Sequence, residues 1–373
     1  MTTSTKASAT TAGETLAPPE GRPGTKRCLA LDAFRGFIMI VLASRGFGFS
    51  ELQGDPTWGR IAHCFDHVPW EGGVFWDMIQ PSFMFMVGVA MPFALVRRLE
   101  LGATDRDNLR HVLVRSIHLI ILSQIVIWVG DDKIRPQLIN VLSQIAFTYF
   151  LTYLIMHWRW RYQAAAAVVL LVGWTTLFFA FPGLDGPFSA RNHIGLVVDR
   201  AIFHYDYDPA YSTLNFFPST VWTLAGAWVG RMLMTSNAHR SNLMKLAGGM
   251  ILSFAVAWAL DPWIPVIKQL CTASFILYSL GWVLFMLIGF YLVTEILGYR
   301  KWTFPLVVVG MNSIFIYFVS EVLFRWLDRA LGVFTFHYNF IGKLAPVAQA
   351  TTVLVAMWYM CYWLYRRAMF FKL

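Results

Sequence analysis

The segment HVPWEGGVFWDMIQPSFMFMVG, residues 67–88, sets ionisable side chains directly before a long apolar run. His67, Glu71 and Asp77 precede this run, which opens with Pro81. Ionisable groups at the mouth of a membrane helix are costly to keep there, so they commonly mark a functional site. The segment therefore predicts a membrane-spanning fold and also the position of its site.

The composition of the 373-residue chain extends this prediction to the whole protein. Hydrophobic residues make up 57% and charged residues only 14%, whereas an ordinary globular domain carries about 25% charged residues. Several apolar runs reach the roughly 20 residues that a helix needs to cross a bilayer. The sequence thus predicts an all-α polytopic membrane protein rather than a set of soluble domains.

One polar stretch and a series of apolar runs divide the chain into a tail and a membrane domain. We expect a disordered tail at residues 1–25, which is rich in Thr, Ala, Ser, Gly and Pro and has no apolar periodicity. One transmembrane domain over residues 26–373 follows, with about ten spanning helices. The predicted spans are residues 28–48, 76–96, 112–130, 138–157, 162–181, 213–233, 246–260, 270–296, 303–324 and 345–366.

Lys and Arg give the chain a net charge of +9 and fall in short clusters between the apolar runs. Such clusters mark the cytoplasmic side of a membrane protein, so they indicate an orientation in the lipid bilayer and no nucleic-acid partner. We therefore expect both termini in the cytoplasm. Exposed apolar helix faces also permit a homodimer. The predicted outer loops are residues 49–75, 131–137, 182–212, 261–269 and 325–344.

His67 is the candidate proton carrier, because an imidazole titrates near neutral pH. Asp66, Glu71 and Asp77 are close enough in sequence to orient or polarise its ring. The alternative interpretation is a surface histidine in a hydrated loop.

A metal site is not expected in this segment. His63 and His67 are four residues apart and would share a helix face beside Asp66, a spacing that zinc sites use. However, the HExxH form is absent and no third ligand is indicated nearby. We interpret His204, Asp206 and Asp208 as polar loop surface. The four cysteines form no CxxC pair and indicate no redox chemistry.

Several arginines are candidate ligands of an anionic cytosolic molecule. Asp32 and Arg35 lie three residues apart at the inner end of the first span, where they can form a structural ion pair. Alternatively, Arg35 contacts a coenzyme phosphate together with Arg98, Arg110 or Arg115, because a guanidinium donates two parallel hydrogen bonds to phosphate.

Polar residues inside the apolar runs need partners in the bundle or line a cavity. Arg115 and His118 lie in the third run, Gln144 in the fourth and Asn312 in the ninth. Hydrogen bonding between helices is the ordinary explanation for the two amides. Lys268, beside the eighth run, is either a topological flank or a cation of the site, and we favour the site.

The order of motifs resembles a known family. The motifs are LDAFRG at 31–36, HVPWEGGVFWDMIQPSFMFMVG at 67–88, NVLSQIAFTY at 140–149, YDPAYSTLNFFPSTVWTLAGAWVG at 207–230, PVIKQLCTASFILYSLG at 265–281 and VVGMNSIFIYF at 308–318. Together they resemble the heparan-α-glucosaminide N-acetyltransferase family of transmembrane acyltransferases, from about residue 28 onward. Because the large extra-membrane segment of the lysosomal enzyme is absent, we expect a bacterial inner-membrane member.

The resemblance implies transfer of the acetyl group of cytosolic acetyl-CoA to an amino sugar, of glucosamine type, on the periplasmic side. The family's active-site histidine falls on His67, with Asp77, Asp66 and Glu71 as its expected catalytic helpers. The candidates for coenzyme binding are Arg35, Arg98, Arg115, Ser44 and Asn312. The candidates for acceptor binding are Trp70, Lys268 and Asn215.

Two positions depart from the family pattern. A functional asparagine near the outer end of the first span is replaced by Ser44-Arg45-Gly46, and a Gln-Arg pair of the fourth helix reads Ser143-Gln144. The role of His67 stays open between general base and carrier of the acetyl group. The alternative function is a transporter of a sugar or a lipid-linked intermediate, although the sequence shows no convincing inverted repeat or paired broken helices.

Overall fold

The computed structural model describes residues 28–131, 137–204, 210–235 and 238–371, and the predicted tail at residues 1–25 lies outside them. Among the described residues every regular element is a helix, and the only β pairing is two isolated bridges. The all-α prediction is therefore confirmed for this part of the chain.

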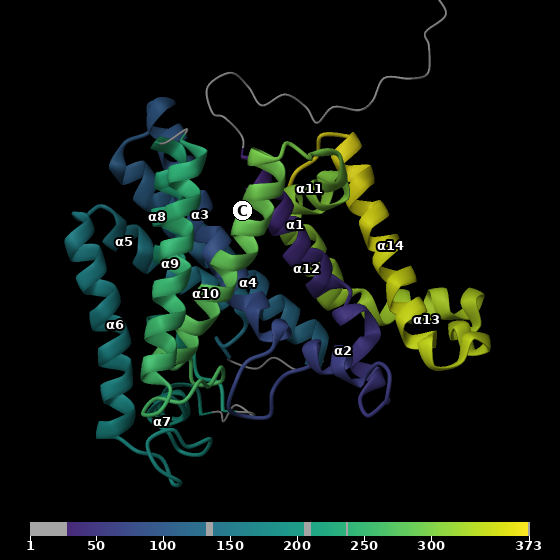
Figure 1. Cartoon of the computed structure of the whole chain (residues 1–373), viewed down its shortest axis with the longest axis horizontal. Helices are drawn as coiled ribbons and strands as arrows, with labels where there is room; N and C mark the ends of the chain where they lie inside the picture. The colour runs from purple at the N-terminus through teal and green to yellow at the C-terminus, as the bar shows by residue number, and fades with distance from the viewer. Residues whose placement is uncertain (1–27, 132–136, 205–209, 236–237, 372–373) are drawn as a thin grey trace, which may run out of the picture.

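The helices form one bundle, with α6 and α9 on one side and α13 and α14 on the other (Figure 1). The longer helices are α1 (Leu29–Ala43), α3 (Ile79–Glu100), α4 (Asp105–Asp131), α5 (Val141–Met156), α6 (Trp160–Ala180), α8 (Phe216–Thr235), α9 (His239–Leu260), α10 (Ala273–Tyr291) and α14 (Ala345–Arg366). The shorter α-helices are α2 (Gly59–Cys64), α7 (Ile194–Phe203), α11 (Phe304–Met311), α12 (Ser313–Val322) and α13 (Phe324–Thr335). Single turns and irregular helices are η1 (Gly46–Leu52), η2 (Phe75–Met78), η3 (Thr213–Asn215), η4 (Leu292–Ile296), η5 (Lys301–Thr303) and η6 (Phe336–Leu344).

Six helical stretches of the described chain are long and apolar enough to cross a membrane, or seven if the bent pair α11 and α12 is one span. This apolar length makes the chain an integral membrane protein. A helix lies on each of the ten predicted segments, but α1 and α5 have only 15 and 16 residues, short of the roughly 20 that span a bilayer. The ten spans and the side of the termini stay predictions.

The ninth predicted span is not one straight helix. It breaks at Asn312 into α11 and α12, which are bent by 69°. The Asn312 amide donates to the carbonyl of Met369 and accepts from the amide N–H of Phe371. The break therefore places the Asn312 side chain against residues 369–371, which follow α14, and there it forms hydrogen bonds with their backbone.

Helix α3 lies at the centre of the fold, and its most extensive partner is α8. A methyl group added at Gly88 would lie 1.9 Å from the carbonyl oxygen of Thr223, and one at Gly226 would lie 2.0 Å from that of Phe85. Backbones this close require glycine at the crossing point, as is common between membrane helices. The crossing positions the first turn of α3, which adjoins the site.

Replacing Gly88 with Leu should force α3 and α8 apart and lower the free energy of unfolding by at least about 2 kcal/mol, as overpacking does. Gly248→Leu on α9 is the control, because nothing lies within 4 Å of a methyl group there. Thermal unfolding of the two variants in detergent measures the difference. Equal stability of both would contradict the close crossing.

Helices α2 and α7 lie at the same end of the bundle (Figure 1), which we name the site end. His193, which precedes α7, is buried there, and its Nε2 donates to the carbonyl of Ala210 over 3.0 Å. The Asp199 carboxylate of α7 accepts from the amide N–H of Thr213 over 2.7 Å. These contacts fasten α7 onto the start of α8.

Burial lowers the pKa of His193 from 6.5 to about 4. The folded protein therefore binds fewer protons than the unfolded chain between these values, so stability should fall as the pH drops through this window. The full loss is about 3 kcal/mol at 1.36 kcal/mol per pKa unit. His193→Gln keeps a donor for Ala210 and should flatten the pH dependence of thermal unfolding, whereas the exposed His63→Gln should not.

Candidate functional site

His67 lies in the loop that joins α2 to η2 at the site end. The Asp66 carboxylate accepts from the backbone N–H of His67 over 2.8 Å, and the Gln53 amide donates to the same carboxylate. Asp66 therefore holds the backbone of the loop and not the imidazole ring. The side chain of His67 is 48% exposed, so its ring is accessible from the site end.

The structure brings His67, Asp77 and Lys268 together. Nδ1 of His67 lies 2.7 Å from Oδ1 of Asp77, and Nζ of Lys268 lies 3.0 Å from both atoms. Asp77 has no exposed surface, and the Lys268 side chain is 9% exposed. The half-exposed imidazole of His67 thus contacts a buried ion pair formed by Asp77 and Lys268.

The sequence around Asp77 explains its position. Asp77 is the third residue of η2, and its Oδ2 accepts from the N–H of Val74 over 3.1 Å, which caps this helical turn. Capping uses one oxygen and leaves Oδ1 for His67 and Lys268. The short helix that opens α3 therefore also fixes the carboxylate of the site.

Lys268 comes from a loop 201 residues further along the chain. The N–H of Gly72 donates to the carbonyl of Val266 over 2.7 Å, and Glu71 pairs with Ile267. This backbone pairing joins the two loops and points Lys268 at Asp77. Burial lowers the pKa of the Lys268 ammonium, and the Asp77 carboxylate opposes that shift.

The turn that carries Lys268 is held by side chains from three helices. Thr272, which caps α10, donates to the carbonyl of Pro265 over 2.8 Å. Asn215 donates to the carbonyl of Gln269 over 2.8 Å, and Trp174 donates to that of Leu270 over 2.9 Å. Asn215 was predicted to bind the acceptor. In the structure it acts on the site indirectly, because it holds the turn that carries Lys268.

The short contact between His67 and Asp77 determines the tautomer. An ionised carboxylate only accepts hydrogen bonds, so Nδ1 of His67 carries the proton and donates it to Oδ1 of Asp77. Lys268 donates to the same oxygen. In the neutral imidazole with this tautomer, Nε2 keeps its lone pair, which is the state needed in a general base.

The imidazole lines a pocket of about 230 Å³ that enters the bundle. Its walls come from α1, η2, α3, α5 and α12 and are mainly apolar. The lining residues are Met39, Leu42, His67, Trp76, Ile79, Gln80, Phe83, Val141, Lys268 and Tyr317. Gln80 and Tyr317 were not among the predicted site residues. Gln80 had a sequence signal, since it is polar and one turn after Asp77.

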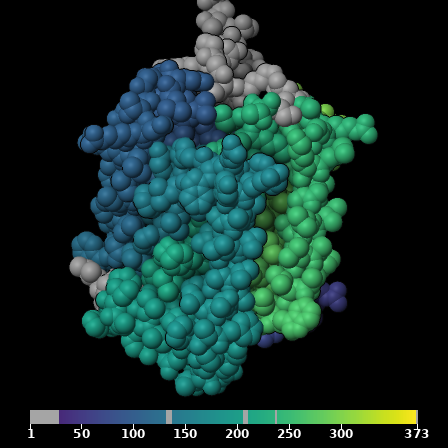
Figure 2. Space-filling model, turned by 90° about the vertical axis from the view of Figure 1, so that its left-hand side faces the viewer, coloured from purple at the N-terminus to yellow at the C-terminus, as the bar shows by residue number. Residues whose placement is uncertain are grey.

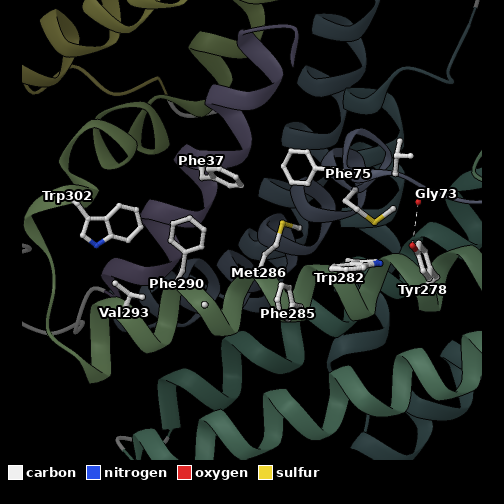
Figure 3. A pocket seen from close by; sticks show the side chains of 13 residues that line it. Phe37, Gly73, Phe75, Tyr278, Trp282, Phe285, Met286, Phe290, Val293 and Trp302 are labelled. Atoms are coloured by element: carbon white, nitrogen blue, oxygen red, sulfur yellow. Dashed lines mark hydrogen bonds between the residues drawn. The ribbon is translucent and has the colours of Figure 1, made fainter. Parts of the chain in front are cut away.

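A second pocket lies on the other side of η2. It has a volume of about 490 Å³ and is almost entirely apolar and aromatic. Phe75 faces this pocket, whereas its neighbour Trp76 faces the pocket of His67. Figure 3 shows Phe75 and Phe37 across from the aromatic residues of α10, and Tyr278 donating to the carbonyl of Gly73 at one end. The turn η2 therefore separates the two pockets.

Three other predicted residues of the site end have structural contacts. Ser44 donates to the carbonyl of Val41 over 2.8 Å and accepts from the N–H of Phe47, so it caps α1. Trp70 packs against the cluster that contains Trp174. Glu71 is exposed, and its backbone pairs with Ile267.

The predicted coenzyme ligands lie on separate elements. Arg35 is 3.6 Å from Asp32, and Arg98 donates to Asn108 over 2.9 Å. Arg98 and Asp77 are 21 residues apart on η2 and α3, which is about 30 Å of helix. The guanidinium of Arg115 lies over the Tyr149 ring at 4.8 Å, and its buried Nε has no hydrogen-bond partner among the described residues.

The residues considered for metal binding do not form a site in the described chain. Helix α2 ends at Cys64, so His63 and His67 do not share a helix face. Asp206 and Asp208 lie outside the described residues. Within the described ranges no group of three His, Cys, Asp or Glu side chains is placed to hold a metal ion, and the four cysteines are free.

The buried charges should be coupled in stability. Asp77→Asn should lower the free energy of unfolding by about 3 kcal/mol, because Lys268 is then buried without its counter-ion. The double variant Asp77→Asn, Lys268→Met should be more stable than Asp77→Asn alone. The pair Asp55 and Lys343, whose Lys343 side chain is 74% exposed, is the control and should show nearly additive effects. Additive effects at Asp77 and Lys268 in thermal unfolding would rule the coupling out.

Comparisons with known proteins give two broad matches, while no family model matches the chain. Heparan-alpha-glucosaminide N-acetyltransferase of Mus musculus is 22% identical over 95% of this chain and 62% of its own length. The Homo sapiens protein of the same name is 22% identical over 93% of this chain and 60% of its own length. The chain thus spans about three-fifths of the length of these relatives. Matches this broad support a distant family relationship with them.

Proposed function

We propose that the chain is a transmembrane acyltransferase that moves the acetyl group of acetyl-CoA to an amino sugar at the site end. The observation that carries this proposal is the contact between the buried Asp77 and Nδ1 of His67, which leaves Nε2 free beside a pocket. The distant relationship to two N-acetyltransferases supports the reaction class.

His67 acts as the general base on the acceptor. Nε2 takes a proton from the attacking amino group while the new nitrogen–carbon bond forms and the carbon–sulfur bond of the thioester breaks. The proton then passes to the thiolate that leaves. The imidazolium formed in between is balanced by the Asp77 carboxylate at 2.7 Å. A sugar hydroxyl as the acceptor would follow the same steps.

Acetyl-CoA would supply the activated acetyl group, and two features of the chain suit it. The pocket beside His67 has apolar walls that accept a narrow acyl and pantetheine chain. The unpartnered Nε of Arg115 is a donor for a phosphate oxygen. Arg98 and Arg35 lie toward the end opposite the site, where the anionic part of the coenzyme would enter.

The proposed orientation places the site end outside the cytoplasm, on the periplasmic side of a bacterial inner membrane. The basic clusters support it, since Arg97 and Arg98 lie in the last turn of α3 and Arg366 ends α14, both at the opposite end. In this orientation the acetyl group crosses the bilayer within the bundle.

His67 has a second proposed role, in which Nε2 carries the acetyl group before the acceptor arrives. The two roles separate in a single experiment with labelled acetyl-CoA and no acceptor. Label that stays on the protein and is absent in a His67→Ala variant supports the carrier. Protein without label supports the general base.

The bent pair α11 and α12 is the feature most like a transporter, because broken helices line many substrate pathways. However, the Asn312 side chain at the break bonds to the backbone of Met369 and Phe371. The end of the chain therefore accounts for the break without a transported ligand.

His67→Ala should reduce acetyl transfer by at least about 10²-fold, the smaller end of the contribution of general-base catalysis. The control is His63→Ala, because His63 is exposed in the same segment and lines no part of the pocket. Proteoliposomes with labelled acetyl-CoA on one side and glucosamine on the other measure the transfer.

Thermal stability of both variants checks that folding is intact. Transfer at the normal rate by a folded His67→Ala protein would overturn the assignment of the base. Unmodified sugar that crosses the membrane would support a transporter instead.

A further inference from the structure

A groove of about 830 Å³ lies on the side of the bundle away from the pocket of His67. Helices α6 and α9 form its two walls, and α8 and α10 form its floor. Val168 and Val172 of α6 face it, as do Gly249 and Val256 of α9. Figure 2 shows this face, with a hollow between the teal surface of α6 and the green surface of α9. We name it the α6–α9 groove.

The two walls stand away from the bundle. Only 22% of the apolar window of α6 and 17% of that of α9 is buried, compared with 67% for η2 and α3. Both wall helices qualify as membrane spans, so the groove opens toward the acyl chains of the bilayer. The lining of the groove is mainly apolar along α6 and α9, which suits acyl chains.

The basic residues of the helices around the groove lie at one end, whereas the acidic Asp261 directly follows α9 at the site end. The sequences of α6, α8 and α9 contain no Asp or Glu. Their Lys and Arg residues all lie at the end opposite the site end. They are Arg161, Arg231, Arg240 and Lys245, with Arg159 directly before α6. Lys245 itself lines the groove, while the lining near the site end is neutral and includes Thr175 and Leu260.

We propose that the α6–α9 groove binds an anionic phospholipid, with its acyl chains along α6 and α9 and its phosphate at Lys245. Basic pockets between membrane helices bind anionic lipid headgroups in this way. A zwitterionic lipid would also bring a phosphate, but its cation would lie among the same basic residues, so a lipid with a net negative charge fits the groove better. The site is independent of the proposed acyl transfer.

A second copy of the chain is a weaker fit for the same groove. Copies in one membrane share their orientation, so a two-fold contact would bring both Lys245 clusters to the same depth. Like charges at that distance repel, and neither copy offers a carboxylate from α6, α8 or α9.

The test is a lipid titration of the purified full-length chain followed by native mass spectrometry. Dioleoyl phosphatidylglycerol and dioleoyl phosphatidylcholine have the same acyl chains and differ in headgroup charge. We expect one phosphatidylglycerol to bind more tightly than phosphatidylcholine. Lys245→Gln should weaken phosphatidylglycerol about fivefold, the usual effect of one basic residue near a lipid surface, and weaken phosphatidylcholine less, because its choline cation offsets the charge of its phosphate.

One further variant and two matched controls locate the binding site. Lys301→Gln removes an exposed lysine outside the groove and should not change binding. Val168→Trp fills the groove and should weaken both lipids, whereas Val169→Trp, on the adjacent face of α6, should not. Equal binding of the two lipids, equal effects of Lys245→Gln and Lys301→Gln, or a dimer that excludes lipid would each overturn the proposal.

Discussion

The Asp77 carboxylate has no exposed surface, so the protein itself must supply every partner that water would have supplied. Val74 donates to one oxygen, and His67 and Lys268 contact the other. Burying an ion without such partners costs several kcal/mol. The loop of His67 and the loop of Lys268 therefore have to meet over Asp77, and the contacts that stabilise this meeting also orient the imidazole.

Close packing and interhelical hydrogen bonds hold the helices that carry these loops, such as the bonds from Trp222 of α8 to Ile276 and Ser279 of α10. Glycines let α3 and α8 cross with their backbones in contact, and this sets the first turn of α3 beside η2. Thr272 begins α10 and closes the turn of Lys268 at the same time. The site thus combines Asp77 from a helical turn with His67 and Lys268 from two loops, which backbone pairing and helix caps hold in place.

Charge is divided between the two ends of the bundle. The site end holds a compensated cluster around Asp77, whereas α6, α8 and α9 carry only basic residues at the opposite end. The proposed coenzyme, with its several phosphates, and the proposed anionic lipid would both be attracted to the basic end. The α6–α9 groove has Lys245 in its lining, whereas the pocket of His67 lies at the site end. The same physical division therefore supports both proposals, although they concern different faces of the protein.

The sequence by itself determined the membrane class, the positions of the long apolar helices and the nearness of His67 to Asp77, because these depend on the hydropathy and spacing of neighbouring residues. It did not predict α2, α7 and α13, which lie mainly in stretches expected to be outer loops. It did not predict that α2 ends at Cys64 or that Asn312 breaks a span, since backbone groups from distant segments decide where a helix stops. Sequence reasoning favoured Lys268 as a cation of the site, but only the tertiary structure placed it on Asp77. The reason is that two loops 201 residues apart meet only where the packing of α3, α8 and α10 brings their helix ends together.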